Sequence, residues 1–190
     1  MKTRNIMIVG VGGQGTLIAS RILGGIATTA GYDVKVSEVH GMAQRGGSVV
    51  TFVRYGDEVA EPIVEPGCAD VLIAFERLEA KRYAHYLKPD GVLILNDVRI
   101  DPMPVVIGAA EYPEGIVEEI EKDHTVYKAD ATAIAMELGN PRCFYVVILG
   151  MVSRHMDYAV EDWYKVIERT VKPKTIEINK KAFDAGYALA

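Results

Sequence analysis

Near its amino terminus the chain reads Ile6-Met7-Ile8-Val9-Gly10-Val11-Gly12-Gly13-Gln14-Gly15, an apolar run followed by a glycine-rich stretch. The apolar run predicts a buried strand, and the spacing of the apolar residues that follow predicts a helix. The glycines permit a tight turn, close approach of a ligand and close packing of the helix on the strand. Free N–H groups at the start of such a helix form a site for an anion. The stretch therefore predicts the strand, turn and helix that open a nucleotide-binding α/β domain.

The glycine spacing fits G-x-G-x-x-G, a pattern that also occurs in α/β folds that bind no dinucleotide. One interpretation is a free-standing NAD-dependent oxidoreductase, with Gly10, Gly12 and Gly15 on the pyrophosphate and Glu38 on the ribose. The other is that the glycines serve only the turn and the packing. The NAD interpretation is weakened because no catalytic set is recognisable and a loop replaces the second helix.

Length, charge and hydropathy restrict the class of protein. The 190 residues suit one domain with a sizeable core, so residues 1–190 are predicted to form a single domain. A net charge of −5 argues against a nucleic-acid surface. No apolar run reaches the roughly 20 residues of a membrane helix. The start of the chain lacks the apolar core of a signal peptide, so a cytoplasmic protein is expected.

The two cysteines, Cys68 and Cys143, are far apart in the sequence. They cannot supply the four thiolates that an iron–sulfur cluster normally takes. The four histidines are scattered without the spacing of zinc ligands. No metal site is therefore predicted on this chain, and the cysteines are interpreted as small core residues.

The pattern of apolar runs predicts a three-layer α/β/α fold with a mostly parallel, Rossmann-like sheet. A β-hairpin excursion is expected after the second strand, formed by residues 48–54 and a returning arm at 59–64. The remaining predicted strands are residues 4–9, 34–39, 71–74, 92–96, 103–107 and 125–129. The predicted helices are residues 14–30, 76–87, 115–122, 131–138, 144–155, 159–171 and 176–189.

A second glycine-rich loop, residues 40–47, follows the second predicted strand. In a parallel sheet the carboxyl ends of the first two strands lie at one edge, so both loops are expected to converge near the first helix. There Arg45 can hold a phosphate or carboxylate, pin the loop to an acidic neighbour, or contact a partner chain. A long loop without a catalytic set beside it favours an interface. The predicted cofactor-binding or partner-contact residues are Gly10, Gly12, Gly13, Gln14, Gly15, Gly41, Met42, Gln44, Arg45, Gly46 and Gly47.

Three acidic residues, Asp70, Glu76 and Asp97, lie near predicted strand ends, where open α/β sheets usually bind ligands. Single acids at such places are more often helix caps or solvated loop residues. The sequence contains no evident nucleophile–base pair, paired acids or metal cluster. No catalytic residue is therefore predicted.

At its two glycine-rich loops the sequence resembles the small subunit of indolepyruvate:ferredoxin oxidoreductase. That subunit corresponds to the gamma subunit or domain of 2-oxoacid:ferredoxin oxidoreductases. The likeness rests on residues 10–15 and on the long motif at 37–49, which is far more specific than the glycine spacing alone. It extends along the chain through residues 70–76, 91–96 and 179–186.

The resemblance implies a function that the residues alone do not. Complexes of this family oxidatively decarboxylate an aryl pyruvate with coenzyme A, giving an aryl-acetyl-CoA, CO2 and reduced ferredoxin. Thiamine diphosphate and [4Fe-4S] clusters are expected on a large catalytic partner subunit, and no cofactor on this chain. The chain is then a non-catalytic member of a heterodimer or larger hetero-oligomer, and it is expected to be inactive by itself.

Within that family the two loops are expected to face the large subunit and to help close its active-site region and the coenzyme A path. Arg45 and the helix start at Gly13, Gln14 and Gly15 are the groups expected to contact a phosphate or the partner. A gamma subunit that acts on pyruvate, 2-oxoglutarate or a branched 2-oxoacid stays open as an alternative. The G-M-A-Q-R-G-G form of the second loop favours the indolepyruvate branch.

Overall fold

The computed structural model describes residues 3–41 and 46–189. Its centre is a six-stranded sheet with the strand order β2-β3-β1-β4-β5-β6. Strands β1, β4, β5 and β6 are parallel neighbours, whereas β3 lies antiparallel between β1 and β2. The strands are β1 (Arg4–Val11), β2 (Asp33–His40), β3 (Ser48–Gly56), β4 (Ala69–Ala74), β5 (Leu87–Asn96) and β6 (Thr125–Ala129).

The helices fill the connections between strands and the carboxyl-terminal third of the chain. They are α1 (Thr16–Thr29), α2 (Arg77–Tyr83), α3 (Met103–Val106), α4 (Ile116–Ile120), α5 (Ala131–Glu137), α6 (Phe144–Ser153), α7 (Val160–Thr170) and α8 (Ile176–Tyr187). Three short 3₁₀ turns are η1 (Ala84–Tyr86), η2 (Pro141–Cys143) and η3 (Pro173–Thr175). Within the described ranges, no helix has both the length and the apolar character needed to cross a bilayer.

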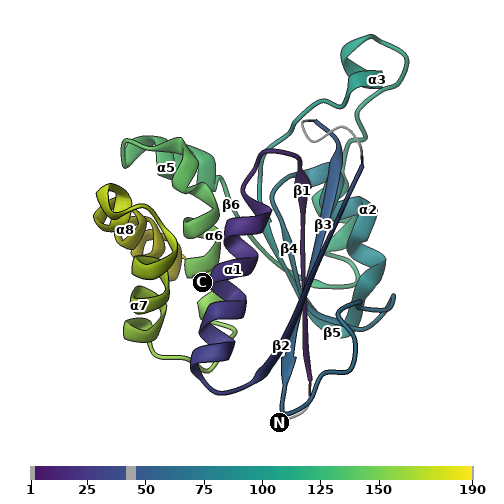
Figure 1. Ribbon diagram of the computed structural model, residues 1–190. Helices are drawn as coiled ribbons and strands as arrows, with labels where there is room; N and C mark the ends of the chain where they lie inside the picture. The colour runs from purple at the N-terminus through teal and green to yellow at the C-terminus, as the bar shows by residue number, and fades with distance from the viewer. Residues whose placement is uncertain (1–2, 42–45, 190) are drawn as a thin grey trace.

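Helices cover both faces of the sheet, which confirms the predicted three-layer α/β/α architecture. Helices α1 and α5 to α8 lie on one face, and α2 lies on the other (Figure 1). Successive side chains of a strand point to opposite faces. On β1, Ile6 and Ile8 therefore join the core under α1 and α6, while Met7 and Val9 join the core under α2.

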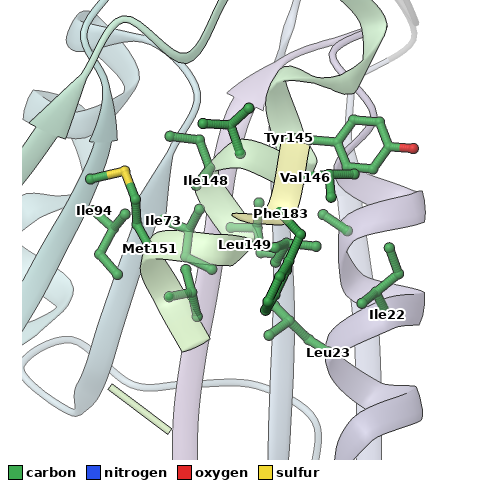
Figure 2. Packing of buried hydrophobic residues seen from close by; sticks show 14 of the residues in the cluster. Ile22, Leu23, Ile73, Ile94, Tyr145, Val146, Ile148, Leu149, Met151 and Phe183 are labelled. Atoms are coloured by element: carbon green, nitrogen blue, oxygen red, sulfur yellow. The ribbon is translucent and has the colours of Figure 1, made fainter. Parts of the chain in front are cut away.

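Helix α6 is the centre of the larger core. All ten of its residues are buried, so it is apolar around its whole circumference rather than along one stripe. Figure 2 shows its side chains between Ile22 and Leu23 of α1, Ile73 and Ile94 of the sheet, and Phe183 of α8. A helix buried on every side in this way explains why its sequence shows no amphipathic period.

The predicted β-hairpin excursion is present, but its strands are β2 and β3. They pair antiparallel around the second glycine-rich loop, and β3 also pairs with β1. The predicted returning arm at 59–64 is wrong, because this segment forms no strand. The Arg54 guanidinium donates to the backbone oxygens of Glu61, at 3.0 Å, and Ile63, at 2.8 Å. Pro62 has no N–H to donate to a sheet. The backbone oxygens on either side of it are bonded by the Arg54 side chain and not by a neighbouring strand.

The predicted strand at 103–107 is also wrong, since residues Met103–Val106 form the short helix α3. Pro102 precedes the helix, and its backbone oxygen accepts hydrogen bonds from the N–H groups of Val105 and Val106. Pro104 lies in the first turn, where its missing N–H would have no intrahelical partner in any case, so it suits a helix start. The apolar residues of this segment have no sheet edge beside them to pair with, because β6 already occupies the edge next to β5.

Candidate functional site

The two glycine-rich loops leave the sheet at the same edge. Strands β1 and β2 each run antiparallel to β3, so their carboxyl ends point the same way although β3 separates them. The Gly12 N–H donates to the backbone oxygen of Gly47 at 2.8 Å. A backbone hydrogen bond therefore joins the first loop to the end of the second.

Gln14 stabilises the first loop from within. Its Oε1 accepts the Val11 N–H at 2.6 Å, and its Nε2 donates to the backbone oxygen of Phe75 at 3.1 Å. A Cβ on Gly10 would lie 2.8 Å from the same Oε1 and 3.2 Å from the Cβ of Phe75. The first glycine is thus needed for the approach of the Gln14 side chain, which links the turn to the end of β4.

The end of the first loop presents an open helix start. Gly13 and Gly15 have φ values of 100° and 92°, which other residues rarely adopt. Gly15 is the N-cap residue of α1, and it supplies no side-chain acceptor. The first turn also carries no acidic residue. The Ile18 N–H donates to the Gly15 oxygen at 3.1 Å. The N–H groups before it have no residue one turn earlier in the helix to bond, and together with the helix dipole they favour an anion here.

A pocket of about 670 Å³ opens in front of this helix start. Apolar side chains such as Ile18 and Phe144 line it, and Arg142 and Arg99 add positive charge, although the Arg99 guanidinium also pairs with Asp101 at 2.5 Å. Burial raises the pKa of the Tyr145 phenol to about 12, so the phenol is protonated at neutral pH. The full lining is Gly13, Gln14, Gly15, Ile18, Val98, Arg99, Ile100, Thr132, Pro141, Arg142, Phe144 and Tyr145. The arrangement suits a ligand with an apolar part and an anionic group.

The pocket contains residues that the sequence did not mark. Arg99, Arg142 and Tyr145 are far from both glycine motifs in the sequence, and none belongs to a recognisable pattern. They reach the pocket because the end of β5 and the start of α6, with the η2 turn before it, lie beside the start of α1. These residues could have been predicted only from the strand order, which places the end of β5 two strands away from the end of β1.

The ribose-binding role considered for Glu38 does not fit the structure. Glu38 lies on β2, which β3 separates from β1, whereas a dinucleotide domain has these two strands side by side. Its Oε2 lies 3.3 Å from the hydroxyls of both Thr16 and Thr51. A smaller pocket of about 430 Å³ lies between Glu38 and the start of α1. The Glu38 carboxylate thus accepts hydrogen bonds from hydroxyls of this chain, and a ribose is not needed to explain its position.

The three acidic candidates have structural contacts. Asp70 lies at the opposite edge of the sheet, where it accepts the Asn5 N–H at 2.7 Å and pairs with Lys88 at 2.7 Å. Asp97 pairs with Arg77 at 2.5 Å. These contacts account for both carboxylates without a ligand.

Glu76 is buried and is the N-cap of α2, where its Oε2 accepts the Glu79 N–H at 3.0 Å. Its Oε1 accepts hydrogen bonds from the Ile100 N–H at 3.2 Å and from the Tyr112 hydroxyl at 2.5 Å. Burial, followed by this contact with Glu76, raises the pKa of Tyr112. One buried carboxylate therefore joins the two ends of the segment that carries α3.

Glu79, the neighbouring buried acid, contacts the second glycine-rich loop at its root. Its carboxylate accepts from the Ser48 hydroxyl at 2.5 Å and from the Arg82 guanidinium at 2.6 Å. Burial raises the pKa of Glu79, while Ser48 and Arg82 act in the opposite direction. The acids at the start of α2 thus bind two segments at the carboxyl edge. Glu79 contacts the end of the second glycine-rich loop, and Glu76 contacts the segment that carries α3.

Not every predicted site residue can be placed. Met42, Gln44 and Arg45 lie outside the described residues. Gly41, Gly46 and Gly47 are described, and Gly46 has a φ of 79°. A Cβ on Gly41 or Gly46 would meet no atom of the described residues within 4 Å. Crowding therefore does not explain these two glycines.

The described part of the chain shows no group of three or more His, Cys, Asp or Glu side chains that could hold a metal. Cys68 is exposed and Cys143 is buried, and both are free. The site thus consists of backbone amides, two arginines, a phenol and an apolar lining.

The model of the pyruvate ferredoxin/flavodoxin oxidoreductase family matches residues 5–189. The chain belongs to this family. It is 44% identical over 197 residues to indolepyruvate oxidoreductase subunit IorB of Pyrococcus horikoshii, covering 100% of this chain and 97% of that protein. The resemblance predicted from the two glycine-rich loops is confirmed, and the chain is a subunit of an oxidoreductase complex.

Two solved structures show the same fold. The gamma subunit of a keto/oxoacid ferredoxin oxidoreductase from Geobacter sulfurreducens has a TM-score of 0.74 at 23% identity, covering 98% of each chain. Pyruvate oxidoreductase subunit PORC from Thermotoga maritima has a TM-score of 0.73 at 26% identity, covering 100% of this chain and 97% of that one. The mixed sheet described above is thus shared with subunits of 2-oxoacid oxidoreductases.

Proposed function

We propose that this chain is the small, non-catalytic subunit of an indolepyruvate:ferredoxin oxidoreductase. The complex then oxidatively decarboxylates indolepyruvate or another aryl pyruvate with coenzyme A, giving an aryl-acetyl-CoA, CO2 and reduced ferredoxin. The observation that carries the proposal is the 44% identity to an indolepyruvate oxidoreductase subunit over the whole of both chains. The G-M-A-Q-R-G-G form of the second loop favours the same branch.

The cofactors of this chemistry are proposed to lie on a large partner subunit. Thiamine diphosphate generates the carbanion equivalent needed for decarboxylation, and [4Fe-4S] clusters carry the electrons to ferredoxin. The residues of this chain do not fit either group, since Cys68 is exposed, Cys143 is buried, and no described acidic or histidine cluster accompanies them. The chain, which we propose forms one domain over residues 1–190, supplies surface and charge.

The carboxyl edge of the sheet is the surface proposed to meet the large subunit. Coenzyme A carries both anionic phosphates and apolar groups. The open start of α1 and the arginines of the adjoining pocket suit one of its phosphates, and the apolar lining suits the rest of the molecule. Arg45, in the second loop, is proposed to contact the same phosphate or the partner. In this position the chain orients a substrate and excludes water but transfers no electron.

The proposal is tested by co-expressing the chain with the thiamine-dependent large subunit of its native host and measuring ferredoxin reduction. Indolepyruvate is expected to be turned over faster than pyruvate or 2-oxoglutarate, and only when both subunits and coenzyme A are present. Arg45→Ala is expected to raise the KM for coenzyme A or weaken assembly by about 10-fold. The matched control is Arg21→Ala, on the exposed side of α1. Turnover by the isolated chain, or preference for pyruvate, would contradict the proposal.

A further inference from the structure

The segment between β5 and α4 carries a projecting lobe, residues 99–111, that contains α3. Figure 1 shows α3 well beyond the end of the sheet, at the edge where β1 and β4 end. Three of its large apolar side chains are exposed: Met103 by 69%, Val106 by 65% and Ile107 by 69%. The spacing 103, 106 and 107 places them on one face of a helical turn. We call these three residues the apolar tip.

The exposure of the apolar tip does not come from a loosely attached loop. Val105 of the same turn packs inward against the core beneath α2. The N–H groups of Ala109 and Ala110 both donate to the backbone oxygen of Pro104, which closes the lobe. Buried Glu76 accepts hydrogen bonds from both ends of the segment. The lobe is therefore a preformed projection with an outward apolar face.

The base of the lobe carries mostly negative charge. Glu111, Glu114 and Glu118 are exposed there, and Glu111 and Glu114 line a hollow together with Val105 and Arg99. A contact between two copies of the chain through this face would bring like charges together. The surface instead fits a different protein, one with an apolar groove bordered by lysine or arginine side chains.

We propose that the lobe is the anchor by which the chain binds the large subunit of its complex, inserting the apolar tip into an apolar groove with a basic rim. The proposal rests on the proposed function, which requires such a partner. The lobe follows the carboxyl end of β5, so it lies at the same edge as the two glycine-rich loops. Its anchoring would bring that edge against the partner. Three apolar residues at helical spacing are a common way for a short helix to enter a groove.

The test measures binding of the full-length chain to the isolated large subunit. The triple variant Met103→Ser/Val106→Ser/Ile107→Ser is expected to raise the Kd by about 100-fold or more, because apolar anchors carry most of the energy of an interface. Its circular dichroism spectrum and Tm are expected to match the wild type, since these side chains are exposed. The control is Ile63→Ser, which is 42% exposed and lies in the connection at the opposite edge of the sheet. Its Kd is expected to change less than 2-fold.

A second variant tests the charge complementarity and does not depend on the fold of the tip. Glu111→Lys/Glu114→Lys is expected to weaken binding by about 10-fold at low salt, with a smaller effect at high salt. Unchanged affinity in both variants overturns the proposal while leaving the proposed function intact. A wild-type dimer that the triple variant abolishes also overturns it, because the occupant is then a second copy. If the wild-type chain binds no large subunit, the proposed function and this inference both fail.

Discussion

Glu76 shows how one buried carboxylate can serve two neighbouring segments. It caps α2 through the Glu79 N–H, and it accepts from Ile100 and Tyr112 at the two ends of the lobe segment. All of these contacts involve strong acceptor oxygens removed from water, so their loss leaves buried donors without partners. Glu76 therefore links the local start of a helix to the position of a distant loop.

Replacing Glu76 with alanine is expected to lower the free energy of unfolding by about 2–4 kcal/mol, from the lost cap and the unpaired donors. Glu76→Gln keeps one acceptor oxygen and is expected to lose less. Urea unfolding of the isolated chain measures both values. Glu137→Ala, at an exposed position on α5, is the control and is expected to stay within about 0.5 kcal/mol of wild type. A loss as small as that for Glu76→Ala would show that the lobe segment is held by other contacts.

His155 gives the stability of the protein a dependence on pH. Burial, followed by the charges of Arg154 and Arg4, lowers the pKa of His155 below its ordinary value of 6.5. Its ring lies 4.5 Å from that of Tyr127, and its Nε2 is buried without a partner among the described residues. The unfolded chain therefore binds a proton at a higher pH than the folded chain.

The free energy of unfolding is expected to fall as the pH drops through 6.5 toward the lower pKa of folded His155, and to be fully restored above 6.5. The variant His155→Phe keeps a ring beside Tyr127 and cannot titrate. Its stability is expected to fall less than that of the wild type between pH 7.5 and pH 5. Thermal unfolding across this range makes the comparison, and parallel curves for the two proteins would rule His155 out as the cause.

At the scale of elements, α6 and α8 pack backbone to backbone through two glycines. A Cβ on Gly186 would lie 1.8 Å from the Val147 oxygen, and one on Gly150 would lie 2.1 Å from the Phe183 oxygen. No side chain can yield to relieve these contacts, since the atoms belong to the backbone of the facing helix. The close approach lets the buried helix α6 be covered by α8 without a cavity.

Gly186→Ala is expected to destabilise the protein by about 3 kcal/mol or more, because α8 must move away from α6. The sign of the change is informative, since alanine is otherwise favoured over glycine in a helix by about 1 kcal/mol. Gly24→Ala in α1 provides the matched control. Its Cβ would be 3.5 Å from Val34, an ordinary contact, so a neutral or stabilising effect is expected. Denaturant unfolding of the two variants distinguishes crowding from helix propensity.

Element prediction succeeded where the pattern was local. The strand, glycine turn and helix over residues 4–29 were predicted from the apolar run and the glycine spacing, and all three are present. The segments at 59–64 and 103–107 look strand-like, but one is bonded to Arg54 and the other starts a helix after Pro102. A distant arginine decided the first outcome, whereas the second follows from prolines within and directly before the segment, which the strand-like apolar pattern concealed.

At the scale of the whole molecule, the insertion of β3 between β1 and β2 is the decisive feature. It turns a parallel nucleotide-binding pattern into a mixed sheet and moves Glu38 away from the first strand. The two glycine-rich loops still end at one edge, as predicted, because a strand and its second neighbour in an antiparallel arrangement point the same way. That edge also carries the pocket and the lobe, so the site is assembled from segments far apart in the sequence.

The sequence by itself determined the glycine turn, the first helix and the family motif, because each depends on residues close together in the chain. The tertiary structure alone decided which strands pair, which arginines reach the helix start, and that Glu76 holds an exposed apolar lobe in place. Those features depend on hydrogen bonds and burial between distant segments. Such contacts form only when the tertiary fold brings the distant segments together, and local sequence patterns carry little information about which segments will meet.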